Sequence, residues 1–211
     1  MLARRPLVAA AVTVAMALGG LGLVGCERRP ADPAATAQAD DMSLGNPAAR
    51  VKVVEYASAS CPHCARWDME VFPGFKAKYV DTGKVRYTLK EYLTDPEALA
   101  AAGFLLARCA GKDRYFPVLD AVFRGQEEMV RTGDVRGVLA RIAKSPGGLT
   151  EAQLDACMRD TAAEKALAAR AERHLHLDKV GSTPTFVING RRFEGEMTLP
   201  EIDAAIAQAA G

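Results

Sequence analysis

The chain has 211 residues, of which 49% are hydrophobic and 25% are charged, and its formal net charge is +1. This profile is typical of a globular protein with a core of ordinary size, and it excludes a largely disordered chain. A charge this balanced offers no general attraction for a polyanion, so nucleic acid is not an expected partner.

Residues 1–25 have the pattern of a signal peptide. Arg4 and Arg5 precede an uncharged, mostly apolar run from Leu7 to Val24, which is the order found in export signals. A retained membrane anchor is an alternative, although the run is of borderline length for crossing a bilayer. Either segment would export the rest of the chain to an oxidising space, where disulfides persist.

The end of this segment, Leu23-Val24-Gly25-Cys26, resembles the bacterial lipobox, in which the cysteine is lipidated and becomes the new N-terminus. The resemblance implies a lipid anchor at Cys26 and a periplasmic, membrane-tethered protein; an ordinary cleaved signal is the alternative. Residues 26–47 then hold several alanines and prolines but few bulky apolar side chains. So little apolar surface can be buried there that we expect a flexible tether.

The folded part opens with a buried strand at residues 50–58, which are rich in valine and aromatic side chains. The sequence CPHC follows at 61–64, and a helical pattern runs over 62–79. Pro73 is expected to kink or divide this helix. Residues 84–93 predict a second strand.

Residues 96–177 have a helical pattern almost throughout and predict four or five short helices. Within them, Thr150 and Gln153 match a capping box. Strand character returns at 185–189, where Asn189-Gly190 is a hairpin signal.

Beyond the hairpin, residues 191–196 predict the returning strand, and 199–209 predict a final amphipathic helix. The order is therefore β-α-β, a helical insert, and β-β-α. No solenoid-type repeat is present in the sequence.

This order, with CPHC at a strand-to-helix junction, resembles the thioredoxin fold, and the helical insertion resembles the DsbA family of exported thiol:disulfide oxidoreductases. CPHC is that family's active-site sequence, and Glu55, Thr183-Pro184 and Gly190 stand where the family has a buried acid, a cis-proline and a glycine. The resemblance implies an α/β thioredoxin-like domain formed by residues 48–95 and 178–211, with an inserted helical domain at residues 96–177.

The two sulfurs of CPHC are expected to differ in chemistry. Cys61 would meet the unpaired N–H groups and the positive end of the helix dipole, which lower a thiol pKa. His63 would add a donor or a positive charge, and Pro62 suits the start of a helix. Cys61 is expected to be exposed and Cys64 shielded. A stabilised thiolate makes the disulfide an oxidant.

Other residues have expected roles around this pair. Glu55 would be a buried acid that relays a proton to Cys64, with an exposed strand glutamate as the alternative. Lys90, on the next predicted strand, is a candidate charge partner for Glu55. Thr183 and Pro184 would line a groove in which an extended substrate chain binds by strand addition.

Lipidation of Cys26 and pairing within CPHC leave Cys109 and Cys157, both in the helical insert. We expect a disulfide between two helices, as some proteins of the resembled family carry; two buried free thiols are the alternative. The CPHC cysteines could instead form a structural disulfide, or bind zinc or copper with His174 and His176. A solvated helix end is the favoured interpretation of those histidines.

The sequence thus predicts a monomeric exported thiol oxidase that introduces disulfides into reduced secreted proteins. The resemblance implies reoxidation by a quinone-linked membrane partner, and no metal or organic cofactor. One alternative is a disulfide isomerase or reductase, because threonine before the cis-proline is shared with isomerase relatives. The other is a periplasmic copper or zinc chaperone that uses Cys61, His63 and Cys64.

Overall fold

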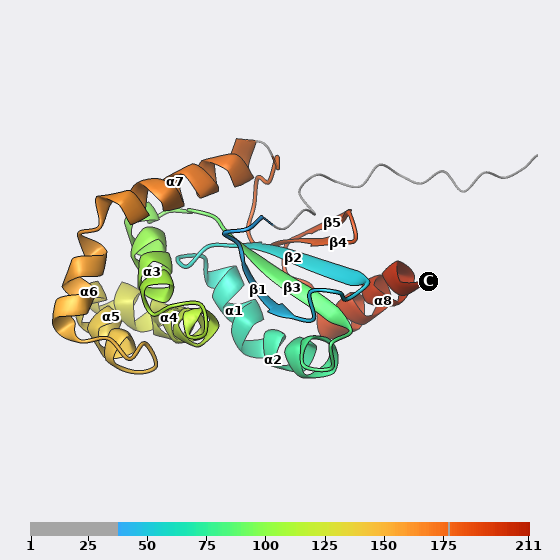
Figure 1. Cartoon of the computed structure of the whole chain (residues 1–211), viewed down its shortest axis with the longest axis horizontal. Coiled ribbons are helices and arrows are strands. Elements are labelled where there is room, and N and C mark those ends of the chain that lie inside the picture. Colours follow the sequence, from blue (N-terminus) through green and yellow to red (C-terminus); the bar gives the residue numbers. More distant parts are fainter. Residues whose placement is uncertain (1–37, 177) are drawn as a thin grey trace, which may run out of the picture.

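A five-stranded sheet forms the centre of the protein in a computed structural model, which describes residues 38–176 and 178–211 (Figure 1). The predicted signal peptide, the lipidation site Cys26 and the first part of the tether lie outside these residues. The strand order is β1-β3-β2-β4-β5, and only β2 and β3 are parallel neighbours. The strands are β1 (Met42–Gly45), β2 (Val51–Ala57), β3 (Val85–Glu91), β4 (Thr185–Ile188) and β5 (Arg191–Glu194).

The helix after CPHC is divided, as predicted. It consists of α1 (Pro62–Glu70), α2 (Phe72–Phe75), which holds Pro73, and a π-helical turn at Lys76–Val80. The predicted hairpin is also confirmed: Asn189 and Gly190 have φ values of 44° and 86°, the positive values that a two-residue type I′ turn requires.

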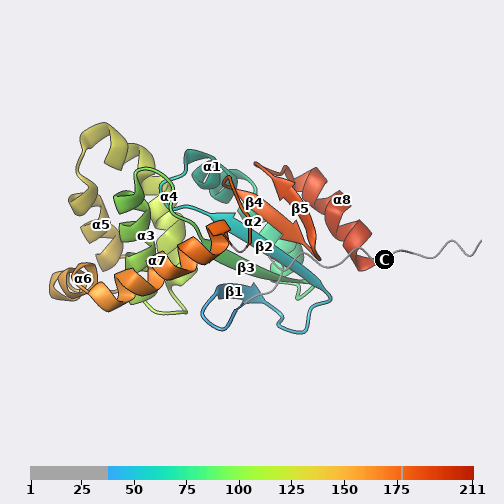
Figure 2. The same cartoon turned by 90° about the horizontal axis from the view of Figure 1, so that it is seen from above.

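The inserted helices lie between β3 and β4 in the chain and gather at one end of the molecule, and α7 returns from them toward the sheet (Figures 1 and 2). Thr150 and Gln153 form the predicted capping box. The helices are α3 (Glu97–Cys109), α4 (Tyr115–Thr132), α5 (Val135–Lys144), α6 (Glu151–Met158) and α7 (Thr161–His176). In the described part of the chain, no helix has the length and apolar character needed to cross a membrane.

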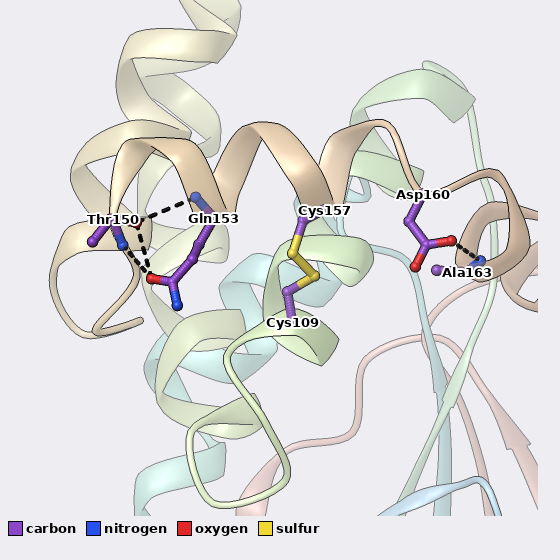
Figure 3. Close-up of a disulfide and its surroundings, with 6 residues drawn as sticks. All are labelled: Cys109, Thr150, Gln153, Cys157, Asp160 and Ala163. Atoms are coloured by element: carbon purple, nitrogen blue, oxygen red, sulfur yellow. Dashed lines mark hydrogen bonds between the residues drawn. A yellow bond between two sulfur atoms is a disulfide. The ribbon is translucent and has the colours of Figure 1, made fainter.

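A disulfide joins Cys109, the last residue of α3, to Cys157 on α6 (Figure 3). The two residues are 48 positions apart in the sequence. In the chain-entropy account, closing a loop of this length removes conformations from the unfolded chain. The bond therefore stabilises the packing of α6 on α3.

The two faces of the sheet differ in what covers them. Side chains alternate between the faces along each strand. Phe186 packs on Trp67 of α1, with ring centroids 4.7 Å apart, and Tyr87 packs on Phe72 of α2. The C-terminal helix α8 (Leu199–Ala210) contacts β2, β4 and α2. The opposite face has its own small apolar cluster, which consists of Val54, Tyr56, Tyr92, Val180 and Val187.

The expected tether is wrong for its last part. Residues 42–45 form the edge strand β1, which pairs antiparallel with β3. Met42 is buried, and the Ser43 and Thr88 hydroxyls hydrogen-bond at 2.9 Å. One buried side chain and the free edge of β3 are enough to order a segment whose composition alone predicts flexibility.

Lys90, the candidate charge partner of Glu55, does not pair with it. In the β2–β3 register, Glu55 lies opposite Leu89, whereas Lys90 lies opposite Tyr56. Adjacent residues on a strand point to opposite faces, so Lys90 is on the face away from Glu55. Its Nζ lies 2.9 Å from Asp178 Oδ2 in a buried ion pair.

Candidate active site

The candidate active site lies where β2 ends and α1 begins. Cys61 is the N-cap residue of α1, with extended backbone, and Pro62 occupies the first turn, where its missing N–H costs no hydrogen bond. The preceding loop is fixed by Ser58, whose hydroxyl accepts hydrogen bonds from the backbone and side chain of Thr94. Gln126 of α4 donates to the Cys61 carbonyl at 3.3 Å, so the helical insert supports the same turn.

The two cysteines are free thiols in very different surroundings. The pKa of Cys61 is lowered to about 5, chiefly because the Cys64 thiol hydrogen-bonds to its sulfur. The Thr183 side chain and the backbone N–H groups of Cys64 and His63 act in the same direction, whereas burial opposes them. The pKa of Cys64 is raised well above its usual value, first by burial and then by Cys61.

The structure corrects the expectation that the Cys61 side chain is exposed. Cys61 keeps 7% of its surface, against none for Cys64. The Thr183-Pro184 segment, whose peptide bond is cis, covers it: Cys61 Sγ lies 3.4 Å from the Thr183 carbonyl oxygen. Two segments 122 residues apart therefore meet at one sulfur.

Glu55 lies on the side of the sheet that faces α1, and it is 2% exposed. Burial raises the pKa of Glu55 to about 8, the negative charges of Asp68 and Cys61 add to the rise, and a hydrogen bond from Tyr87 opposes it. Tyr87 Oη donates to Glu55 Oε2 at 2.5 Å. The charge of Glu55 in turn raises the pKa of Cys64.

Replacing Glu55 with glutamine should change how stability depends on pH. A carboxyl whose pKa is raised in the folded state favours folding at low pH, and that contribution is lost as pH rises from about 4.5 to about 8. We therefore expect Glu55→Gln to gain stability over the parent protein across this range, by at most about 1.4 kcal/mol per pH unit.

Urea unfolding of the oxidised forms at several pH values measures this difference, because the disulfide keeps Cys61 and Cys64 from titrating. Glu70→Gln, at an exposed position of α1, is the matched control. Parallel stability curves for Glu55→Gln and the parent protein would show that the carboxyl does not titrate as proposed.

His63 makes a contact that the sequence did not indicate. Its Nδ1 lies 2.5 Å from Glu196 Oε1 and 3.3 Å from an Arg66 guanidinium nitrogen. The contribution of His63 to the lowered pKa of Cys61 comes from its backbone N–H. The imidazole is thus held by a carboxylate, whereas we expected it to be directed at the sulfur.

The alternative metal site has little support from the histidines near the end of α7. No cluster of three or more potential ligands suited to a metal occurs among residues 38–176 and 178–211. His174 is fully buried, and its Nδ1 lies 2.6 Å from the Glu91 carbonyl oxygen. The predicted solvated helix end is therefore wrong for His174, because α7 packs this side chain against β3.

A family model described as Thioredoxin matches residues 37–208. The chain belongs to this thioredoxin family. A "Putative protein-disulfide oxidoreductase" of Rickettsia bellii is 33% identical over 171 residues, which are 81% of this chain and 64% of the relative. The chain spans 60–64% of the length of the first five curated relatives.

Solved structures of thioredoxin-like proteins confirm the predicted α/β fold with inserted helices. Alpha-DsbA1 of Wolbachia pipientis superposes with a TM-score of 0.77 at 24% identity, over 85% of this chain and 96% of that one. A thioredoxin-like oxidoreductase of Silicibacter pomeroyi gives 0.65 at 28% identity, over 84% and 96%.

Sequence patterns identified the site residues that belong to a recognisable motif. They did not identify residues that reach the site from segments distant in the sequence. Gln126 and Glu196 have no motif around them, since their roles arise only where α4 and the segment after β5 approach α1. Tyr87 could have been suspected, because it lies on the same face of the neighbouring strand as the predicted buried acid.

Proposed function

We propose that the protein is an exported thiol:disulfide oxidoreductase that introduces disulfides into reduced proteins at Cys61 and Cys64. The observation that supports this most directly is the difference in pKa between the two thiols. One thiol has a pKa of about 5, and its neighbour has a pKa well above the usual value. A stable Cys61 thiolate favours the reduced dithiol, so the disulfide form is an electron acceptor.

The proposed exchange has two steps. A substrate thiolate attacks Cys61 Sγ of the disulfide form, the Cys61–Cys64 bond breaks, and a mixed disulfide forms while Cys64 leaves as thiolate. A second substrate thiolate then attacks the substrate sulfur of the mixed disulfide, which forms the substrate disulfide and releases Cys61 as thiolate. Two electrons pass from the substrate to the dithiol.

Glu55 is suited to supply the proton that Cys64 needs in the first step. Its pKa of about 8 keeps the carboxyl largely protonated at neutral pH. Cys64, whose pKa is raised, is an unstable anion in its buried position. Proton transfer from the acid to the leaving sulfur therefore runs downhill, and solvent then restores the proton of Glu55.

The proposal extends to substrates, partners and place. Thr183 and Pro184 would bind an extended substrate chain by strand addition beside Cys61, since the Thr183 carbonyl already lies against its sulfur. A lipid on Cys26 would tether a periplasmic monomer to the membrane, and a quinone-linked membrane protein would reoxidise it. Residues 48–95 with 178–211 would form the redox domain, covered by residues 96–177.

Oxidation of a reduced, unfolded protein with several cysteines tests the function. The disulfide form should oxidise it in stoichiometric amounts, and Cys61→Ser should not. Faster rescue of a scrambled substrate than oxidation of a reduced one would favour an isomerase instead. Chelator-resistant binding of copper or zinc to the reduced protein, without thiol exchange, would contradict the proposal in favour of a metal chaperone.

A further inference from the structure

The segment between β5 and α8 is fixed to both halves of the active site. The Gly195 N–H donates to the Pro184 carbonyl at 2.9 Å, next to the cis peptide bond. Trp67 Nε1 of α1 donates to the Met197 carbonyl, also at 2.9 Å. Glu196 lies between these two anchors, so its backbone is held to the substrate-facing segment on one side and to the active-site helix on the other.

The Glu196 carboxylate contacts two side chains of the first turns of α1, His63 and Arg66. Besides its contact with His63 Nδ1, Glu196 Oε1 lies 3.6 Å from an Arg66 guanidinium nitrogen. The guanidinium and a protonated Nδ1 are both donors and cannot hydrogen-bond to each other. The carboxylate is therefore the acceptor that holds the cluster together, and its side chain is only 30% exposed, against 60% for His63 and 50% for Arg66.

The charge of Glu196 bears on the redox balance because the two redox states differ in charge at Cys61. The reduced form carries a thiolate there, whereas the disulfide form carries none. Positive charge beside the sulfur stabilises the reduced form and makes the disulfide a stronger oxidant. A carboxylate that neutralises part of that positive charge has the opposite effect.

We infer that Glu196 is a positioning residue that holds the His63 imidazole and, by offsetting the positive charge of Arg66, limits how strongly oxidising the Cys61–Cys64 disulfide is. The inference rests on the proposed function of that pair. It assigns the β5–α8 segment a tuning role, in addition to the substrate-facing role of the neighbouring Thr183-Pro184 segment.

Glutamine at position 196 keeps the shape and the acceptor oxygen but removes the charge. The equilibrium to be measured is disulfide protein plus two glutathione thiols, giving dithiol protein and one glutathione disulfide. One proton is released because Cys61 remains a thiolate. Glu196→Gln should shift this equilibrium about two- to fivefold toward the reduced protein, and the shift should shrink at high salt. The pKa of Cys61 should fall in the same variant.

Glu194→Gln is the matched control, since Glu194 is an exposed glutamate on the same hairpin. Its equilibrium and the pKa of Cys61 should stay at the parent values. Equal values for Glu196→Gln and Glu194→Gln, in a parent protein that still has a low Cys61 pKa, would overturn this inference alone. A parent Cys61 that ionises like free cysteine would overturn the proposed function. Thermal unfolding of the disulfide forms checks that both variants are folded.

Discussion

Replacing Cys64 with alanine should raise the pKa of Cys61 well above about 5. When mixed with a substrate that already contains a disulfide, the variant should also hold that substrate in a mixed disulfide with Cys61. The hydrogen bond from the Cys64 thiol is the largest cause of the lowered pKa, and alanine cannot donate it. In this direction the Cys61 thiolate attacks the substrate disulfide and one substrate sulfur leaves as thiolate. Without Cys64, no internal sulfur can then attack Cys61 Sγ and release the substrate. Each unit by which the pKa of Cys61 rises corresponds to about 1.4 kcal/mol less stabilisation of its thiolate.

Cys64→Ser separates the two effects. Serine keeps a donor beside Cys61 but cannot resolve a disulfide, so it should trap substrate while keeping the pKa of Cys61 lower than alanine does. Thiolate absorbance as a function of pH gives the pKa, and non-reducing electrophoresis gives the trapped complex. The idea fails if alanine and serine give the same Cys61 pKa, or if neither variant holds substrate.

The centre of the site could be predicted because its determinants are contiguous in the sequence. A valine-rich strand, CPHC and a helical pattern follow one another within about thirty residues, and local propensity determines each of them. The Asn189-Gly190 turn and the Thr150 capping box were predictable for the same reason. In each case the structure-determining contacts lie within a few residues of one another.

Contacts between distant segments escaped prediction. Lys90 was assigned to the wrong face because strand register, which decides the face, is set by pairing across the sheet. β1 was read as tether because its order comes from the edge of β3 and not from its own composition. His174 is buried by the return of α7 to the sheet, which no local pattern near it indicates.

For the same reason, the sequence did not predict a polar junction between the sheet and the inserted helices. Glu91, at the end of β3, is 1% exposed and read in the sequence as an ordinary strand residue. It accepts hydrogen bonds from Arg108 Nε of α3 at 2.6 Å, from Arg170 Nε of α7 at 2.8 Å and from Tyr115 Oη of α4 at 3.0 Å. One carboxylate therefore ties three helices of the insert to the strand next to the active-site strand.

Glu91→Gln should destabilise the protein by about 3–5 kcal/mol, because it removes the nearer and more buried of the two carboxylates that pair with the Arg170 guanidinium; Asp40, at 3.8 Å, is partly exposed. Asp155→Asn is the control: Asp155 pairs with Arg136 on the surface, and its loss should cost less than about 1 kcal/mol. Urea unfolding of the disulfide forms measures both.

A double variant shows whether Glu91→Gln destabilises the protein through an unpaired buried charge or through lost hydrogen bonds alone. A buried charge is costly when its partner is removed, whereas removing both partners is tolerated. In the double variant Glu91→Gln/Arg170→Met, the loss of stability should therefore be smaller than the sum of the two single losses. Additive losses would mean that Glu91 and Arg170 contribute independently and that the ion pair is not what holds α7 against β3. If Glu91→Gln lowered the stability as little as Asp155→Asn does, the hydrogen bonds around Glu91 would not contribute appreciably to the stability of the fold.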